Sequence, residues 1–327
     1  MFRSADPLHR RLLAVAVAVA ATAWCSGALA QAAWPSKPVK IMVGFPGGST
    51  PDMAARALAD VLAKSLGQPV VVENRPGASG DIAADAVAKA GDGHTLGVVI
   101  NGNLTSAKLL KAALPYDPAT DFAFVSLLAT APLVLVTPPD LPAGAEFFAA
   151  ARASAGKWSY GSVGIGSVGH LGMEVVKSRA GNFEAVHVPY NGNPAVITAI
   201  LGGQIQMALM PPGIALPQVK AGKMKAIGLT GPRSPMAPDT PSLSELGVQM
   251  DPLEVWVALV APASLSAAAK ERLAREVPAA VNGEARERLL SAGWQGVGSS
   301  ADGLRHRVGR DTEILGGIIK ARGIKIE

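Results

Sequence analysis

Two glycine-rich turns early in the chain carry groups that can hold a small anion without a charged side chain. The first spans residues 44–52 (GFPGGSTPD) and the second spans residues 73–80 (ENRPGASG). Each turn follows a β-branched run and precedes an alanine-rich helical pattern. The backbone N–H groups at the start of a helix have no partner inside the helix, and the helix dipole is positive there. Two such turns at one edge of a parallel sheet therefore predict a site for a carboxylate.

A third glycine-rich segment, residues 164–169 (GIGSVG), matches the G-x-G-x-x-G pattern of dinucleotide-binding proteins. That pattern needs an acidic residue about 20 positions further on, at the end of the next strand. Here the expected strand, 184–188, is followed by Pro189 and Tyr190 instead. We therefore expect no nicotinamide cofactor, and we expect this turn to offer its N–H groups to a carboxylate.

Ser167 in this segment allows a second hypothesis, a hydrolase with a serine nucleophile. The surrounding sequence lacks the leading glycine of the G-x-S-x-G turn. His170 lies only three residues later, where an α/β-hydrolase does not place its base. We expect His170 either to donate to a ligand or to serve the fold. Catalysis by Ser167 stays an alternative to binding.

Composition argues against several other classes of site. The formal charge of +5 falls to +3 once residues 1–30 are removed, and no basic block is interleaved with aromatic residues. Nucleic-acid binding is therefore not expected. The only cysteine, Cys25, lies in that segment, and four widely spaced histidines remain after it. We expect no disulfide, no metal site and no cofactor.

The first 30 residues have the pattern of a cleavable export signal. Arg3, Arg10 and Arg11 precede an apolar stretch at 12–23, and residues 28–30 (ALA) form an A-x-A cleavage site. The pattern predicts a periplasmic protein. General secretion is favoured, although the arginine pair leaves twin-arginine export open. A lipoprotein is disfavoured, because the residue before the cysteine is a tryptophan.

The elements that must position these turns alternate between strand and helix along nearly the whole chain. This alternation predicts an α/β protein with mainly parallel sheets. The clearest helix is expected to begin at Thr50, as the capping residue, and to end at Gly67. Two long apolar runs, residues 122–137 and 254–262, interrupt the alternation. Further strands are expected at 94–100, 158–162, 184–188, 205–210 and 224–230, and further helices at 267–281 and 301–322.

Apolar runs of that length suit strands that leave one sheet and enter another. Two such crossings divide a chain into two hinged lobes that can close on a ligand. The expected boundaries place residues 31–133 and 254–327 in the first lobe and residues 134–253 in the second. Two consecutive domains, or one large sheet, are the alternatives.

Several short motifs, spread over essentially the whole chain after residue 30, are informative through their order and spacing. They are residues 34–38 (WPSKP), 45–52, 67–78 (GQPVVVENRPGA), 114–118 (LPYDP), 166–171, 186–190 (VHVPY), 201–204 (LGGQ) and 220–223 (KAGK). Together they resemble the periplasmic solute-binding proteins of tripartite tricarboxylate transporters, also called Bug proteins. The resemblance implies a two-lobe Venus-flytrap fold, similar to type II periplasmic binding proteins. It also implies a small carboxylate enclosed between the lobes, delivery to inner-membrane permease subunits, and no catalysis.

In proteins of this family the carboxylate is held by backbone N–H groups, hydroxyl groups and ordered water. The residues alone favour a different role for one candidate, Asp52, because an acidic residue in the first helical turn is more often a capping partner. The resemblance implies ligand contacts at Phe45, Gly48, Ser49, Thr50 and Asp52 in the first turn, Ala78 and Ser79 in the second, Asn101 after the third strand, Ser162, Gly166, Ser167 and His170 in the second lobe, and Tyr190 and Pro211 at the rim.

Two departures from the family pattern lie where the ligand would be chosen. The usual Phe-Pro-Pro-Gly-Gly turn reads FPGGS at residues 45–49, and the position after the third strand, often threonine or serine, is Asn101. A dicarboxylate, an amino acid and an aromatic acid all fit a pocket of this kind. We expect a monomer. A ligand sensor, whose closed form is read by a sensor kinase, is an alternative role.

Overall fold

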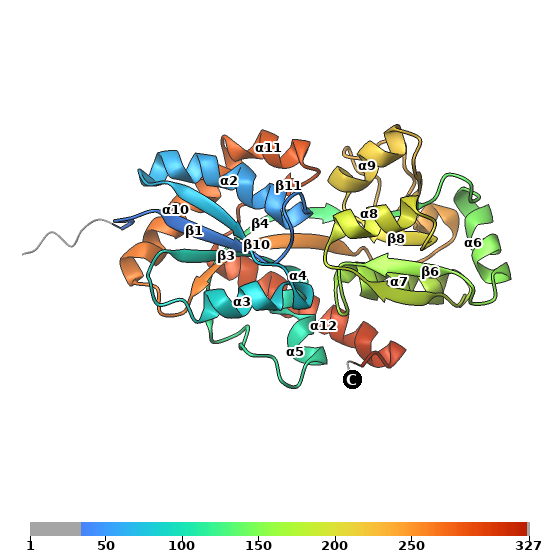
Figure 1. Cartoon of the computed structure of the whole chain (residues 1–327), viewed down its shortest axis with the longest axis horizontal. Coiled ribbons are helices and arrows are strands. Elements are labelled where there is room, and N and C mark those ends of the chain that lie inside the picture. The colour runs from blue at the N-terminus through green and yellow to red at the C-terminus, as the bar shows by residue number, and fades with distance from the viewer. Residues whose placement is uncertain (1–33, 326–327) are drawn as a thin grey trace, which may run out of the picture.

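The computed structural model describes residues 34–325, so the predicted export signal lies outside the described part of the chain. Two β-sheets, each with helices packed on both faces, lie side by side along the long axis of the molecule (Figure 1). We call the six-stranded sheet with its helices the first lobe, and the five-stranded sheet with its helices the second lobe.

The first lobe contains both turns that the sequence singles out. The order of its sheet is β11 (Gln295–Gly296), β4 (Phe122–Pro132), β10 (Glu254–Pro262), β3 (Thr95–Ile100), β1 (Val39–Val43) and β2 (Val70–Asn74). β1 pairs in parallel with β2 and β3, whereas β10 runs antiparallel to β3 and β4. Its helices are α2 (Thr50–Leu66), α3 (Asp81–Ala88), α4 (Asn101–Leu104), α5 (Ser106–Leu110), α10 (Ala267–Asn282), α11 (Ala285–Ser291) and α12 (Ala301–Arg322), with a 3₁₀ turn η1 (Ala78–Gly80).

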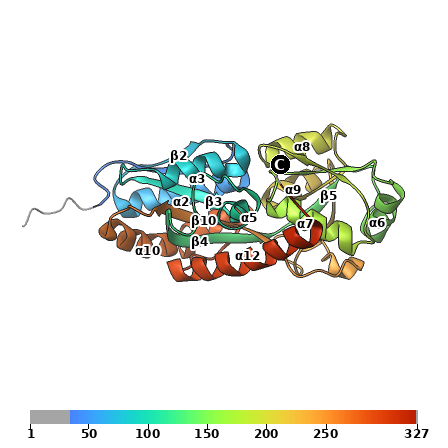
Figure 2. The same ribbon diagram turned by 90° about the horizontal axis from the view of Figure 1, so that it is seen from below.

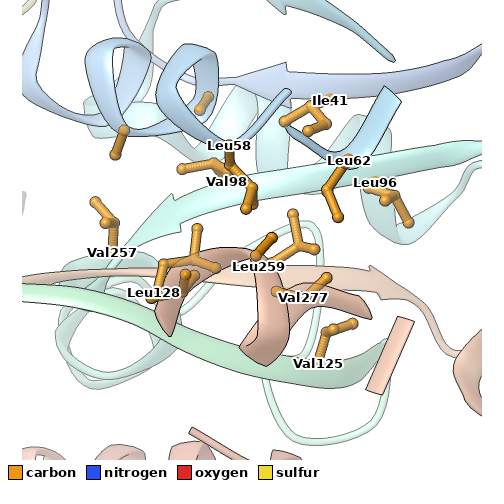
Figure 3. Packing of buried hydrophobic residues seen from close by; sticks show 14 of the residues in the cluster. Ile41, Leu58, Leu62, Leu96, Val98, Val125, Leu128, Val257, Leu259 and Val277 are labelled. Carbon is orange, nitrogen blue, oxygen red and sulfur yellow. The ribbon is translucent and has the colours of Figure 1, made fainter. Parts of the chain in front are cut away.

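The two-residue period of the strands divides the first lobe into two buried clusters, one on each face of the sheet. In β10, Val257 and Leu259 pack toward α2 and α10, whereas Trp256 and Val260 pack toward α3 and α12. Figure 3 shows the first of these clusters, in which side chains from the sheet meet those of the covering helices. Helices cover both faces of the sheet, so the polar turns at the strand ends are the part of the sheet that faces out of this lobe.

The second lobe repeats the same three-layer plan. Its sheet has the order β7 (Val186–Pro189), β6 (Ser159–Ser162), β8 (Met207–Met210), β5 (Val134–Thr137) and β9 (Lys225–Leu229). One face is covered by α6 (Gly144–Ala153) and α7 (Val168–Arg179), and the other by α8 (Asn193–Leu201) and α9 (Pro212–Lys220). A 3₁₀ turn, η2 (Ser244–Leu246), precedes the return to the first lobe.

Three segments connect the lobes. β4 ends at Pro132 and β5 begins at Val134, so Leu133 alone separates a strand of one sheet from a strand of the other. The chain returns directly into β10 at Glu254. α12 is the third connection: it packs on β4, and its last turns pack on α7 of the second lobe (Figure 2). The change from one sheet to the other at β4–β5 and before β10 agrees with the predicted lobe boundaries, which stay a proposal. α12 contacts both lobes.

The structure confirms most of the predicted elements and corrects two expectations. The sheets are mixed rather than mainly parallel, because the strands at the crossings, β4, β5 and β10, run against their neighbours. The cap of α2 is Ser49, and Thr50 is already the first helical residue. α2 ends as predicted, with Gly67 in the left-handed conformation at φ 72°.

Candidate functional site

A cavity of about 40 Å³ lies between the two lobes. Its wall comes from the strand ends and turns of both sheets and from the crossing segments. Most of the wall is apolar. The lining residues are Phe45, Ser49, Thr50, Pro51, Ile100, Asn101, Leu133, Val163, Ser167, Val168, Gly169, Asn193, Leu209, Pro211, Val255 and Trp294.

The N-termini of four helices converge on this cavity. Thr50 begins α2, Ser167 caps α7, Asn193 begins α8 and Pro211 caps α9, and all four residues line the wall. The N-terminal end of a helix carries about half a positive charge, spread over N–H groups that lack helical partners. Four such ends favour an anion in the cavity, and no Asp, Glu, Lys, Arg or His lines it.

Two polar side chains in the wall have an atom without a hydrogen-bond partner among residues 34–325. These atoms are Oγ of Ser49 and Oδ1 of Asn101, and both residues are only 1% exposed. Buried polar atoms in folded proteins are almost always hydrogen-bonded, so an unpaired one marks a place where a ligand or water supplies the partner. The wall therefore offers one hydroxyl and one amide oxygen for recognition.

The first turn is held rigid by Asp52, which lies behind the cavity wall. Its carboxylate accepts hydrogen bonds from the Gly48 N–H (2.9 Å), the Asn74 side chain (2.8 Å) and Arg56 Nε (3.0 Å). The Asn74 amide also donates to the Phe45 carbonyl at 2.9 Å. Burial raises the pKa of Asp52, but these hydrogen bonds outweigh it, so the pKa lies below its ordinary value. Asp52 thus holds the turn in shape, in agreement with the structural role that its place in the first helical turn favours.

The second turn is held by a buried network around Asp81. Tyr116 donates to this carboxylate at 2.7 Å, Asn103 donates to it at 2.8 Å, and Lys111 forms an ion pair with it. Asn103 also donates to the carbonyl of Ser79 at 3.1 Å. Burial, with the charge of Asp81 beside it, raises the pKa of Tyr116, so the phenol stays protonated as a donor. The network fixes η1 in a backbone conformation in which Ser79 has φ 61°.

The lobes touch closely on both sides of the cavity. Asn193 Nδ2 in the second lobe donates to Thr50 Oγ1 in the first at 3.0 Å, and Ser106 Oγ in the first donates to the Gly166 carbonyl at 2.7 Å. A Cβ atom placed on Gly164 would lie 1.9 Å from Ser79 Oγ. Gly164 and Gly166 therefore serve the close approach of the two lobes, whereas Gly169 packs against the Leu209 carbonyl within the second lobe. The close contact between the lobes therefore explains why glycine stands at the first two glycine positions of the G-x-G-x-x-G pattern.

His170 belongs to a column of stacked rings in the second lobe, in which His170 and Tyr160 are buried and His187 is half-buried. Its ring stacks on His187 at 4.0 Å between centroids, and His187 stacks on Tyr160 at 4.9 Å. The Gly166 N–H donates to His170 Nδ1 at 3.1 Å, so this nitrogen is an acceptor. Burial lowers the pKa of His170 to about 4. Burial and the neighbouring His170 lower that of His187 to about 3, so both rings are neutral at pH 7.

The serines near these rings have structural partners. Ser167 caps α7 by accepting the backbone N–H of His170 at 3.3 Å. Ser162 Oγ lies 2.7 Å from His187 Nε2 and accepts the Gly164 N–H at 3.1 Å. Within the described residues no carboxylate bonds to the other ring nitrogen of His187, and neither member of this pair lines the cavity. The arrangement lacks the third group that orients the base in a hydrolase.

Six predicted contact residues line the cavity: Phe45, Ser49, Thr50, Asn101, Ser167 and Pro211. Ser79 and Gly166 line a smaller adjoining hollow of about 10 Å³, together with Ser167. The remaining ones lie outside both. Gly48 and Asp52 hold the first turn, the carbonyl of Ala78 accepts from Lys111, Ser162 and His170 bond within the second lobe, and Tyr190 packs beside Gly161.

Two polar wall residues were not predicted from the sequence. Asn193 follows Gly192 and precedes Pro194, and this helix-start pattern signals its place at the head of α8. Trp294 carries no such signal. Its Nε1 donates to the carbonyl of Thr50 at 3.2 Å across 244 positions of sequence, so only the fold brings the two together.

Neither a metal cluster nor a membrane-spanning helix is found in the part of the chain that the structure describes. Residues 34–325 contain no group of three or more His, Cys, Asp or Glu side chains placed to hold a metal ion. None of their helices is long and apolar enough to cross a membrane.

Comparisons with known proteins agree with this geometry. A family model described as the tripartite tricarboxylate transporter family receptor matches residues 54–324. Protein BugT of Bordetella pertussis is 32% identical over 324 residues, which cover 97% of this chain and 99% of BugT.

Solved structures share the two-lobe arrangement. Periplasmic binding protein BugD matches with a TM-score of 0.84 at 26% identity, over 90% of this chain and 100% of its own. MatC of Rhodopseudomonas palustris, solved with bound malate, matches with a TM-score of 0.80 at 28% identity, over 88% of this chain and 100% of its own. The predicted periplasmic-binding-protein fold is therefore confirmed.

Proposed function

This chain belongs to the tripartite tricarboxylate transporter receptor family, and we propose that it is a periplasmic solute-binding protein that captures a small carboxylate between its two lobes. It delivers the ligand to the membrane permease subunits of a tripartite transporter. The observation that carries the proposal is the cavity between the lobes, on which the N-termini of α2, α7, α8 and α9 converge and which no charged side chain lines.

The chemistry of this wall suits capture. A carboxylate gains from N–H groups and hydroxyls that point at it, and the positive helix ends stabilise its charge without a counter-ion. The first lobe contributes Ser49 and Thr50, and the second contributes Ser167 and Asn193. A ligand that bridges both sets stabilises the closed form, because only contacts made after closure can shift the equilibrium toward it.

The comparisons support the ligand class and the location. MatC, solved with malate, shares the fold and 28% of aligned residues, and malate is a small carboxylate. The predicted export signal at residues 1–30 and the likeness to periplasmic BugD both support a periplasmic protein. Neither serine near the histidine column has the arrangement of a nucleophile with an oriented base, which supports binding without turnover.

The direct test is a thermal-shift screen of the purified protein against small carboxylic acids, each paired with its uncharged amide. The protein is unfolded and refolded first, so that ligand retained through purification is removed. A ligand at about 100 times its Kd stabilises the folded form by about 2.7 kcal/mol, which a melting curve resolves. We expect at least one acid to raise Tm and its amide to have no effect. Absence of any shift across the panel would overturn the proposal.

Delivery to a transporter is tested in the cell. Deletion of the gene should abolish uptake of the acid found in the screen, and restoring the wild-type protein should restore uptake. A Ser49→Ala variant, which removes one wall hydroxyl, should restore it only partly at low acid concentration. Unchanged uptake in the deletion strain would exclude the transport role while leaving carboxylate binding in place.

A further inference from the structure

The amide of Asn101 is fixed in one orientation by its surroundings. Its Nδ2 donates to the main-chain carbonyl of Glu254 at 3.3 Å. A carbonyl can only accept, so the reversed amide would set two oxygens against each other. Oδ1 is therefore the free end of the amide, in a residue that lines the cavity and is 1% exposed.

A fixed amide oxygen can be satisfied only by a donor. It has no partner among the described residues, and an ionised carboxylate, a ketone or an ether brings no proton to it. An acceptor of the ligand placed here would face Oδ1 with like partial charge, and both would stay buried and unpaired. Of the groups that an acid can bring in place of a water molecule, a hydroxyl or an ammonium group can supply the missing hydrogen bond.

The electrostatics of the cavity favour the hydroxyl. Four positive helix ends meet there and no Asp or Glu lines the wall, so an ammonium group would lose its hydration without gaining a counter-charge. A hydroxyl is neutral and can both donate to Oδ1 and accept from a neighbour. Ser49 Oγ, the other unpaired wall atom, can serve as donor or acceptor and so imposes no comparable choice.

We propose that Asn101 makes this site selective for hydroxycarboxylic acids over the corresponding oxo acids and amino acids. The inference rests on the proposed function, since it presumes that a carboxylate occupies the cavity. It narrows the ligand class: the acid carries a hydroxyl on its chain, and the side chain that reads it is Asn101.

The experiment measures Kd by calorimetry for matched pairs that differ only in that group. The probes are L-lactate and pyruvate, L-malate and oxaloacetate, and 3-hydroxybutyrate and acetoacetate, with L-alanine and L-aspartate as the amino acids. For the pair that fits the cavity best, we expect the hydroxy acid to bind at least about tenfold more tightly than the oxo acid, equivalent to about 1.4 kcal/mol. The amino acid should bind more weakly than the hydroxy acid.

Two variants assign the preference to its residue. Asn101→Thr replaces the fixed acceptor by a hydroxyl that can donate or accept, so the ratio of the two Kd values should fall toward one. Ser49→Ala is the matched control, because its hydroxyl also lines the cavity but does not discriminate. It should weaken both members of a pair by similar factors and leave the ratio unchanged.

The outcomes distinguish failure of the hydroxy-acid selectivity from failure of the proposed carboxylate capture. Equal Kd values for a hydroxy acid and its oxo acid, or tighter binding of the oxo acid, would overturn the selectivity while leaving carboxylate capture standing. A wild-type preference that persists in Asn101→Thr would overturn the assignment to Asn101. No binding of any acid by the refolded protein would overturn the proposed function itself.

Discussion

Removal of the Ser106 hydroxyl tests how strongly contact between the lobes holds the closed form. Ser106 Oγ donates to the carbonyl of Gly166 across the lobe boundary at 2.7 Å, and this bond is buried. The same hydroxyl lies 3.4 Å from the carbonyl of Gly102 in its own lobe. Ser106 lines the small adjoining hollow but not the central cavity, so a Ser106→Ala variant changes closure without removing an atom from the wall of the central cavity.

The expected change in Kd follows from the hydrogen bond that the Gly166 carbonyl loses. In the closed form it is left buried without a donor, which costs about 1–3 kcal/mol. In separated lobes the carbonyl is free to bond with water, so the cost falls on the closed form alone. Since about 1.4 kcal/mol corresponds to a tenfold change in an equilibrium constant, we expect Kd for the bound acid to rise about tenfold. The dissociation rate should carry most of that change.

Calorimetry and stopped-flow fluorescence measure these quantities. The control is Ser126→Ala, which removes a buried serine hydroxyl that donates to the Leu127 carbonyl at 3.2 Å within the first lobe. Both variants should lower Tm slightly without ligand, but only Ser106→Ala should change Kd. If Ser106→Ala binds the acid as tightly as the wild type does, this contact does not stabilise the closed form and the reasoning is refuted.

Three further predictions concern the turns and the histidine column. Gly164→Ala should raise Kd more than Ser106→Ala does, because a Cβ on Gly164 would lie 1.9 Å from Ser79 Oγ, and Gly164 has φ 133°. Adding Ser79→Gly removes the clash and should bring Kd part of the way back to the wild-type value. If Kd does not recover, backbone strain at residue 164 alone is responsible. The pKa of Asp52 is lowered in the folded chain, so its stabilisation is present above about pH 4 and is lost as the pH falls further. Asp52→Asn should therefore lower Tm at pH 7 and flatten the acid limb of Tm against pH, and a limb as steep as that of the wild type would contradict this. The pKa values of His170 and His187, lowered to about 4 and about 3, make unfolding take up protons, so the free energy of unfolding should fall from about pH 6.5 toward pH 4. His187→Phe, which keeps the stack, should reduce that slope in thermal melts, and an unchanged slope would exclude His187 as the cause.

The sequence could predict where the turns lie because their signals are local. A β-branched run, a glycine-rich turn and a proline in the first helical turn place Phe45, Ser49 and Thr50 at the end of a strand and the start of a helix. Asn101 could be placed for the same reason, since it directly follows β3. Such patterns depend on neighbours only a few positions away, and the fold of both lobes preserves them.

Partners chosen by distant parts of the chain could not be predicted. The Gly166 N–H was expected to meet the ligand, but it donates to His170, whose ring position depends on the stack with His187. Trp294 enters the cavity wall from near the end of the chain. In each case the deciding contact joins elements whose relative placement depends on the packing of a whole lobe.

Helix α12 has a consequence for how the lobes can move. Leu304 near its start is buried in the first lobe, Leu315 in the second, and Arg322 at its end forms an ion pair with Glu174 of α7 at 3.3 Å. Two strands alone would form a ribbon that twists as readily as it bends. A helix anchored in both lobes adds resistance to torsion, which favours rotation about a single bending axis. Such a hinge returns the two sides of the cavity to the same register at every closure. A site built partly from helix N-termini needs that reproducibility, because main-chain N–H groups cannot change rotamer to correct a misaligned closure.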